Sequence, residues 1–145
     1  METNVSIRQV TLNDSVSIAE LSLQLGYPSS ANEIRKRLIE LVNDKDNCTF
    51  AAVIDGKVVG WIHAYYAIRI ESAPFVEIGG LVIDENYRGR HIGEKLVTVV
   101  TNWARMKGVK TLRIRSNTQR LQAHQFYRHI GFKEIKEQKI FTFDL

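Results

Sequence analysis

The hydrophobic pattern at the start of the chain predicts one strand and two helices. Residues 5–10 alternate between apolar and polar side chains as an edge strand does, and apolar residues recur at helical spacing over residues 13–25. Gly26-Tyr27-Pro28 follows and ends this helix. Because Ser30 and Glu33 have the spacing of a capping box, a second helix is expected to begin there.

Three strand patterns occupy the middle of the chain. Residues 49–54 and 57–70 flank Asp55-Gly56, a dipeptide that tolerates the positive φ angles of a tight hairpin turn. Residues 75–83 are mostly apolar, as expected of a central strand that is buried on both faces. Gly79-Gly80 interrupts this strand and indicates a β-bulge, which would leave backbone N–H and C=O groups unpaired.

The second half of the chain alternates between helical and strand patterns. These patterns predict a helix over residues 92–107, a strand over 111–115, a helix over 119–130 and two short strands within 132–145. Gly108 and Gly131 follow the two helices, where glycine commonly terminates a helix. Since the chain contains no internal repeat, these elements are expected to form one domain over residues 1–145.

Composition and charge narrow the classes of function. The chain has 145 residues, of which 44% are hydrophobic and 25% charged, so it can bury a globular core and contains no tract typical of a disordered tail. Its net charge of +4 favours an anionic ligand, but the basic residues are scattered, so we expect no nucleic-acid partner. Neither a signal peptide nor a membrane-spanning segment is recognisable, and a cytoplasmic protein without a membrane partner is expected.

Cysteine and histidine usage gives no sign of disulfide or metal chemistry. Cys48 is the single cysteine and stands at the start of an apolar strand, where a buried, inert thiol is expected. The four histidines lack metal-ligand spacing, so no metal is predicted. His63 and His124 are expected to have structural roles.

The most distinctive segment is the run Asn-Tyr-Arg-Gly-Arg-His-Ile-Gly-Glu-Lys-Leu at residues 86–96, between the central strand and the following helix. A glycine-containing turn that leads into a helix directs several free backbone N–H groups at one anion, and the helix dipole adds positive partial charge there. Arg88 and Arg90 add full charges. In a right-handed strand–helix–strand crossover this turn lies at the carboxyl end of the strand, where ligands collect. The segment therefore predicts a pyrophosphate-binding site.

These features resemble the GCN5-related N-acetyltransferases over nearly the whole chain. The turn motif of that family is Arg or Gln, two residues of any kind, Gly, any residue, then Gly or Ala, and Arg88, Ile92 and Gly93 match it. His91 occupies the place of the first glycine, which implies either a backbone angle that histidine tolerates or an altered phosphate loop. Further resemblance lies in Ala123-His124-Gln125-Phe126-Tyr127 and Gly131-Phe132.

The resemblance implies an α/β fold with a mixed, mostly antiparallel sheet of six to seven strands, about four flanking helices and a β-bulge in the central strand. It also implies acetyl-CoA as the acyl donor, with the pantetheine arm along the central strand and the pyrophosphate at the turn. The implied cofactor-binding residues are Leu81, Val82, Ile83, Arg88, Gly89, Arg90, His91, Ile92, Gly93, Glu94, Asn117 and Arg120.

Catalytic roles also follow from the resemblance. Tyr127 matches the family's tyrosine near the end of its helix and is implied to protonate the coenzyme sulfur, although a core tyrosine with a satisfied hydroxyl is the alternative. Glu77 precedes the bulge and is a candidate to withdraw a proton from the amine, or else it pairs with a neighbouring arginine. A backbone N–H near Leu81 would stabilise the oxyanion. Arg120 stands where family members often carry an asparagine, and Asn117 is the alternative for that role.

The function implied is transfer of acetyl from acetyl-CoA to a primary amine by direct attack in a ternary complex. Residues 116–132 are also similar to small-molecule acetylases that act on aminoglycosides or aminoalkylphosphonates, which favours a small amine. The alternatives are a non-catalytic acyl-CoA-binding module and an acetyltransferase that acts on a protein amine. Residues 139–144 either close the sheet edge or pair across a homodimer.

Overall fold

The computed structural model describes residues 4–145, which form two compact units that divide between Ile114 and Arg115. The first unit contains a five-stranded sheet and three α-helices, and the second contains a fourth helix and the terminal segment. The single domain expected over residues 1–145 stays a prediction. No helix within the described residues is long and apolar enough to cross a membrane.

The order of elements follows the sequence patterns closely up to residue 130. In the first unit it is β1 (Ser6–Gln9), α1 (Ser15–Leu23), α2 (Ala31–Leu41), β2 (Asn47–Ile54), β3 (Lys57–Arg69), β4 (Ser72–Ile83), α3 (Ile92–Met106) and β5 (Leu112–Ile114). Short 3-10 turns at Leu12–Asp14 and Glu85–Tyr87 lie before α1 and α3. The second unit contributes α4 (Leu121–His129). These bounds differ from the expected ones by a few residues.

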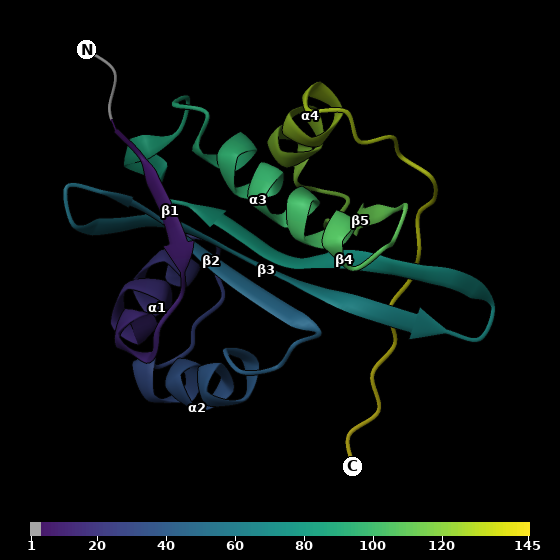
Figure 1. Ribbon diagram of the computed structural model, residues 1–145, viewed down its shortest axis with the longest axis horizontal. Helices are drawn as coiled ribbons and strands as arrows, with labels where there is room; N and C mark the ends of the chain where they lie inside the picture. The colour runs from purple at the N-terminus through teal and green to yellow at the C-terminus, as the bar shows by residue number, and fades with distance from the viewer. Residues whose placement is uncertain (1–3) are drawn as a thin grey trace. The chain divides into compact units, whose positions relative to one another are not determined.

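The sheet is mixed and mostly antiparallel, as predicted. Its strand order is β1-β2-β3-β4-β5; the first four strands pair antiparallel with their neighbours, and β5 runs parallel to β4 (Figure 1). Asp55 (φ 49°) and Gly56 (φ 77°) both have positive φ between β2 and β3, as a type I′ hairpin turn requires. The hairpin turn predicted at this dipeptide is therefore confirmed.

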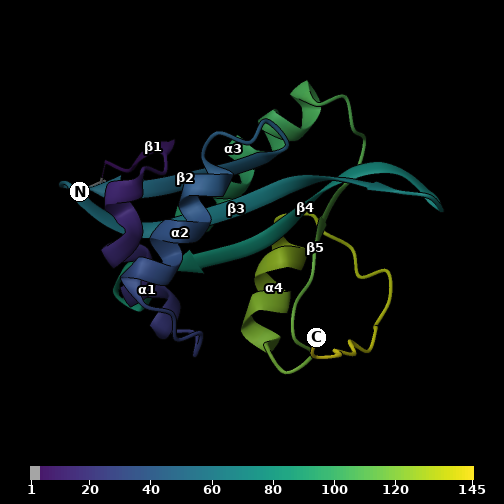
Figure 2. The same cartoon turned by 90° about the horizontal axis from the view of Figure 1, so that it is seen from below.

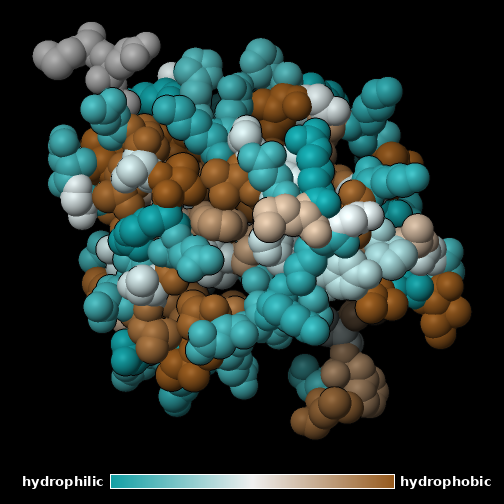
Figure 3. All heavy atoms as spheres, in the orientation of Figure 1, coloured by the Kyte–Doolittle hydropathy of each residue, from teal (hydrophilic) through white to brown (hydrophobic). Residues whose placement is uncertain are grey.

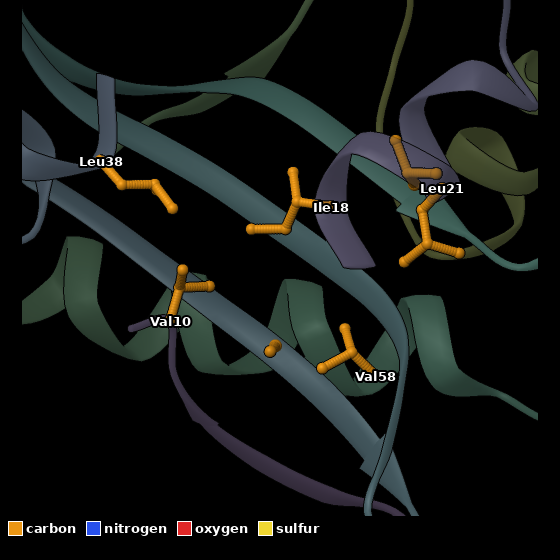
Figure 4. Close-up of a cluster of buried hydrophobic side chains, with 7 residues drawn as sticks. Val10, Ile18, Leu21, Leu38 and Val58 are labelled. Carbon is orange, nitrogen blue, oxygen red and sulfur yellow. The ribbon is translucent and has the colours of Figure 1, made fainter. Parts of the chain in front are cut away.

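Helices cover both faces of the sheet in the first unit. α1 and α2 lie on one face and α3 on the other, as Figures 1 and 2 show from two directions. One buried cluster fills the space under α1 and α2 (Figure 4) and consists of Val10, Ile18, Leu21, Leu38, Ala51, Val58 and Val82. On α3, Leu96 and Val100 are fully buried. This packing holds β4 in the interior of the first unit. The amino end of α3 lies beside the carboxyl end of β4.

A capping box marks the start of α2, and a buried ion pair lies at the start of α1. Ser30 Oγ accepts a hydrogen bond from the Glu33 N–H at 3.1 Å, and Glu33 Oε1 accepts one from the Ser30 N–H at 3.0 Å, which confirms the capping box of α2. Asp14, before α1, is buried and accepts hydrogen bonds from both terminal nitrogens of Arg8 at 2.8 and 2.9 Å. Ser30 thus caps α2, whereas Asp14 makes no side-chain cap hydrogen bond with α1 and has its buried charge paired with Arg8.

The strand count of six to seven is wrong for the described residues, which contain five strands. The two terminal strands predicted within 132–145 are absent, and that segment has no regular secondary structure. Every side chain from 133 to 145 is exposed. An alternating pattern shows that a segment is compatible with a strand, but a strand forms only where a neighbouring backbone accepts its hydrogen bonds.

Hydrophilic side chains dominate the face of the molecule in Figure 3, with hydrophobic patches between them. One patch lies over α1 and α2, where Val16, Leu23 and Ile39 are exposed by 58%, 62% and 52%. A small patch of this kind is ordinary on a protein surface and by itself indicates no particular partner.

Candidate active site

The half of β4 that leads to the distinctive segment has one unpaired edge. β5 pairs only with Val76, Glu77 and Ile78, whereas β3 pairs with β4 as far as Ile83. From residue 79 to 83, therefore, no strand of the described chain lies on the side of β4 opposite to β3. In an antiparallel pair, alternate residues direct their N–H and C=O groups away from the partner strand, so this edge offers hydrogen-bonding groups to an extended ligand.

The register of β4 against β3 shifts at the double glycine. His63 pairs with Gly80, but Ala64 pairs with Ile78, which leaves Gly79 between the two pairs. Side chains of β3 fill the space beside both glycines: a Cβ on Gly79 would lie 3.2 Å from His63 Nδ1, and one on Gly80 only 2.7 Å from the Trp61 ring. Close approach of the Trp61 ring, rather than a positive φ angle, favours glycine at residue 80, and the contact beside Gly79 is tight but less severe.

The loop after β4 delivers the chain to the amino end of α3. Asp84, 4% exposed, accepts a hydrogen bond from the Asn86 N–H at 3.0 Å and so caps the 3-10 turn. Gly89 (φ 80°) and His91 (φ 61°, ψ 20°) both adopt the left-handed conformation. His91 thus adopts a left-handed backbone conformation, which fits the first of the two alternatives stated for this position.

The first turn of α3 has backbone donors available. His91 is the N-cap residue and makes no side-chain cap hydrogen bond, so its side chain leaves the N–H groups of Ile92 and Gly93 uncapped. These groups point along the helix axis, where the helix dipole is positive. This arrangement satisfies the geometric requirement of an anion site at a helix terminus.

Charged side chains surround this terminus. Arg88 and Arg90 are exposed on the loop, and the Arg90 guanidinium lies 4.9 Å from the centre of the Tyr87 ring. His91 Nδ1 lies 3.5 Å from a carboxylate oxygen of Glu94, with the two side chains 73% and 37% exposed. Two arginines against the one carboxylate of Glu94 leave residues 88–94 positive on balance.

Coenzyme A fits the chemistry of these two features taken together. Its pantetheine arm is a chain with neutral amides, which match the unpaired N–H and C=O groups of residues 79–83, and its diphosphate matches the uncapped terminus of α3. The structure brings ten of the expected cofactor-binding residues into this one stretch of chain: Leu81, Val82, Ile83, Arg88, Gly89, Arg90, His91, Ile92, Gly93 and Glu94.

Glu77 lies in β4, two residues before the register shift. It is 5% exposed, and its Oε2 accepts a hydrogen bond from the hydroxyl of Tyr65, its register partner on β3. Reasoning from the sequence did not connect these two residues. Counting from the Asp55-Gly56 turn gives the pairing of β3 with β2 only, and the pairing of β3 with β4 depends on the irregularity at Gly79.

The second unit holds the remaining candidates. Tyr127, on α4, is 9% exposed, and its ring makes edge-to-face contacts with Phe126 and Phe132. Burial raises the pKa of the Tyr127 hydroxyl, although a hydrogen bond and the positive charge of Arg120 act in the opposite direction. The hydroxyl therefore stays protonated at neutral pH, as a proton donor must.

Asn117 and Arg120 shape the turn that starts α4. The Asn117 carbonyl oxygen accepts a hydrogen bond from the Arg120 N–H at 3.0 Å, and its side-chain Oδ1 accepts one from the Gln119 N–H at 2.9 Å. His124 Nε2 lies 2.9 Å from the same carbonyl oxygen, which gives His124 the structural role expected of it. Among residues 4–145, no cluster of three His, Cys, Asp or Glu side chains is arranged to hold a metal ion.

An unpaired sheet edge that leads to an uncapped, positively charged helix terminus defines an α/β protein built to bind an acyl-CoA. Comparison with known families identifies which one: the model of the "Acetyltransferase (GNAT) family" matches residues 16–132. The chain belongs to this family, as its motifs indicate, and is an N-acetyltransferase with acetyl-CoA as co-substrate.

Relatives of known name include bacterial acetyltransferases. The chain is 28% identical to an aminoglycoside N(6′)-acetyltransferase type 1 of Stenotrophomonas maltophilia over 97% of this chain and 94% of the relative. It is 32% identical to the aminoalkylphosphonate N-acetyltransferase of Salmonella typhimurium over 57% of this chain and 54% of the relative.

Solved structures show the same fold. The aminoglycoside N-acetyltransferase AAC(6′)-Iy in complex with CoA superposes with a TM-score of 0.85 at 20% identity, over 99% of this chain and 97% of that one. AAC(6′)-Ih from Acinetobacter baumannii superposes with a TM-score of 0.86 at 16% identity, over 98% and 99% of the two chains.

Proposed function

We propose that the protein transfers the acetyl group of acetyl-CoA to a primary amine of a small molecule, by direct attack in a ternary complex. The observation that carries this proposal is the unpaired edge of β4 at residues 79–83, which leads within a few residues to the uncapped amino end of α3. The relative that spans nearly the whole chain acts on aminoglycosides, by its name, and this favours a small amine over a protein amine.

The bond changes assign a role to each candidate. The amine nitrogen bonds to the thioester carbon, the carbon–sulfur bond breaks, and one amine proton leaves while the sulfur gains one. Glu77 takes the amine proton, directly or through water, and the Tyr127 hydroxyl gives a proton to the sulfur. A backbone N–H near Leu81 stabilises the negative charge that develops on the thioester oxygen.

Several structural features support the cofactor part of this proposal. We interpret the register shift at Gly79 as the β-bulge, because one extra residue on β4 stands against β3 there. The bulge turns the strand so that the edge at Leu81 and Ile83 is left for the pantetheine arm. Asn117 and Arg120 are proposed to contact the arm or an ordered water, and one acetyltransferase domain is proposed to comprise both units, since the family match spans them.

An amine panel with detection of the released thiol tests the proposal. The panel contains aminoglycosides, aminoalkylphosphonates, polyamines and peptides with a free amino terminus. We expect acetylation of a small amine, and we expect Tyr127→Phe to lower kcat by about 10²-fold or more, the usual contribution of a general acid. CoA affinity, measured by calorimetry, should stay within about twofold of wild type, as expected when only a transition-state interaction is lost.

Each alternative predicts a distinct outcome. Tyr27→Phe is the matched control for Tyr127→Phe, because Tyr27 is 61% exposed and lies outside the site. Binding of CoA without acetylation of any amine favours the acyl-CoA-binding module, and activity confined to peptides favours a protein amine. If the chain bound no CoA, the proposal would be wrong.

The homodimer is a further proposal, which sedimentation analysis would test. The cytoplasmic location and the lack of a nucleic-acid partner stay predictions.

A further inference from the structure

Four polar residues form a row across the sheet. Asn47 on β2 pairs with Tyr65 on β3, Tyr65 pairs with Glu77 on β4, and Glu77 pairs with Arg113 on β5. Residues that face one another on neighbouring strands project from the same side of a sheet, so the row is one feature on one face. None of the sequence motifs marks this row.

The hydrogen bond in the middle of the row joins two titratable groups. The Tyr65 hydroxyl donates to Oε2 of Glu77, and Glu77 is 5% exposed. A carboxylate removed from water needs hydrogen-bond donors to remain ionised, and a phenolic hydroxyl fixed on the neighbouring strand supplies one in a constant direction. This bond therefore fixes the orientation of the carboxylate.

The Tyr65 ring is itself held in place by its neighbours. The His63 ring lies 5.9 Å from it, centre to centre, and His63 Nε2 lies 2.8 Å from Asn47 Oδ1. On the other side, a Cβ on Gly79 would lie 3.3 Å from Tyr65 Cε1, so the absence of a side chain at residue 79 leaves the space that the ring occupies. The irregular stretch of β4 thus serves the Tyr65–Glu77 pair as well as the proposed cofactor edge.

From this arrangement we infer that Tyr65 is a positioning residue, which holds the Glu77 carboxylate in the orientation in which it accepts the proton of the amine. The inference rests on the proposed function in one respect, namely that Glu77 is the base. Its physical part, the action of Tyr65 on Glu77, is independent of any activity and is measurable separately.

The first measurement follows the carboxyl carbon of Glu77 by NMR in protein labelled with ¹³C-glutamate, with Glu77→Gln to assign the resonance. In Tyr65→Phe we expect the midpoint of the Glu77 titration to move to higher pH by about one unit, the typical effect of losing a hydrogen bond to a charged group. The sign follows because a carboxylate that loses a donor is less stable in its charged form. Tyr66→Phe is the matched control, since Tyr66 is the next residue on β3 and pairs with Val76 on the opposite side of the sheet.

The second measurement is the pH profile of kcat/KM for the amine that the panel acetylates best. The acid limb should move upward in Tyr65→Phe by the same amount as the NMR midpoint, because only the ionised carboxylate accepts a proton. The affinity for CoA and the melting temperature are measured alongside. In Tyr66→Phe, the CoA affinity and the melting temperature should both stay close to wild type. In Tyr65→Phe, the CoA affinity should stay close to wild type.

The two measurements separate the two claims. An unmoved NMR midpoint in folded Tyr65→Phe, or an equal shift in Tyr66→Phe, overturns the inference about Tyr65. A shifted midpoint together with an unmoved acid limb, or with no acetylation of any amine, upholds the action of Tyr65 on Glu77 and removes Glu77 from the role of base. If Tyr65→Phe fails to fold, Tyr65→His and Tyr65→Leu take its place. The histidine ring can still donate a hydrogen bond, whereas leucine cannot. The midpoint of the Glu77 titration should therefore stay nearer to wild type in Tyr65→His than in Tyr65→Leu.

Discussion

The indole ring of Trp61 on β3 lies directly against the backbone of Gly80 on β4. A Cβ added to Gly80 would lie 2.7 Å from both Cη2 and Cζ3 of this ring, a distance that side-chain carbons do not tolerate. Trp61 also packs against the buried cluster under α1 and α2, so the ring has little freedom to move away. Gly80 thereby links the core of the first unit to the β4 edge proposed to bind the cofactor.

Replacing Gly80 by alanine should destabilise the protein. We expect a loss of about 1–3 kcal/mol in the free energy of unfolding, the usual cost of overpacking a core, measured by urea denaturation. Combining Gly80→Ala with Trp61→Phe should recover part of the loss, because the smaller ring leaves room for the methyl group. Strict additivity of the two substitutions would contradict a direct clash.

The backbone at His91 predicts opposite effects for two substitutions. His91 has φ 61° at the N-cap of α3, a conformation that costs most residues about 1–2 kcal/mol and glycine almost nothing. His91→Gly should therefore raise the free energy of unfolding by up to about 1 kcal/mol after its extra chain entropy is counted, whereas His91→Val should lower it by about 1 kcal/mol or more. Thermal unfolding of the two variants beside wild type tests this order, and equal stability of both would contradict it.

Features set by neighbouring residues in the chain were predictable from the sequence. The Asp55-Gly56 turn, the Ser30–Glu33 capping box and the uncapped start of α3 each depend on residue types within a few positions of one another. Such short-range chemistry is nearly independent of the rest of the fold, so these three local features follow from the sequence alone.

Features that depend on pairing between distant segments were not predictable. The Tyr65–Glu77 bond exists because the register shifts at Gly79, and a shift of one residue would place the two side chains on opposite faces. Ile140 and Phe141 show the converse: their segment alternates like a strand, yet both side chains are exposed by 77% or more, since no neighbouring strand of the described chain pairs with it. An alternating hydrophobic pattern shows that a segment can form a strand. Whether the strand forms depends on a neighbouring strand that pairs with it.

Burial of His63 should make stability depend on pH. Burial lowers the pKa of the His63 imidazole below its ordinary value of 6.5, so the unfolded chain takes up a proton before the folded protein does. The contribution of His63 is thus fully present above pH 6.5, declines as the pH falls below that value, and levels off below the folded pKa. His63→Gln should lose less stability than wild type between pH 7 and pH 5, as urea denaturation at each pH would show.

Cys48 should not react with thiol reagents in the native protein. Burial raises the pKa of its thiol to about 12, against smaller opposite effects of the Ala64 backbone and the Lys107 charge, and its side chain lies in β2 with the residue 7% exposed. The thiolate is the reactive form, so at pH 8 only about one molecule in 10⁴ carries it. A disulfide reagent should therefore detect no protein thiol in the native state during an assay of minutes, and one equivalent after denaturation. Cys48→Ala, which lacks the thiol, gives the baseline for both readings.

Rapid reaction of one equivalent of thiol in the native protein would show that β2 opens locally or that the Cys48 thiol is accessible. Absence of that signal would leave coenzyme A as the source of thiol in the amine panel, which makes the panel quantitative without correction.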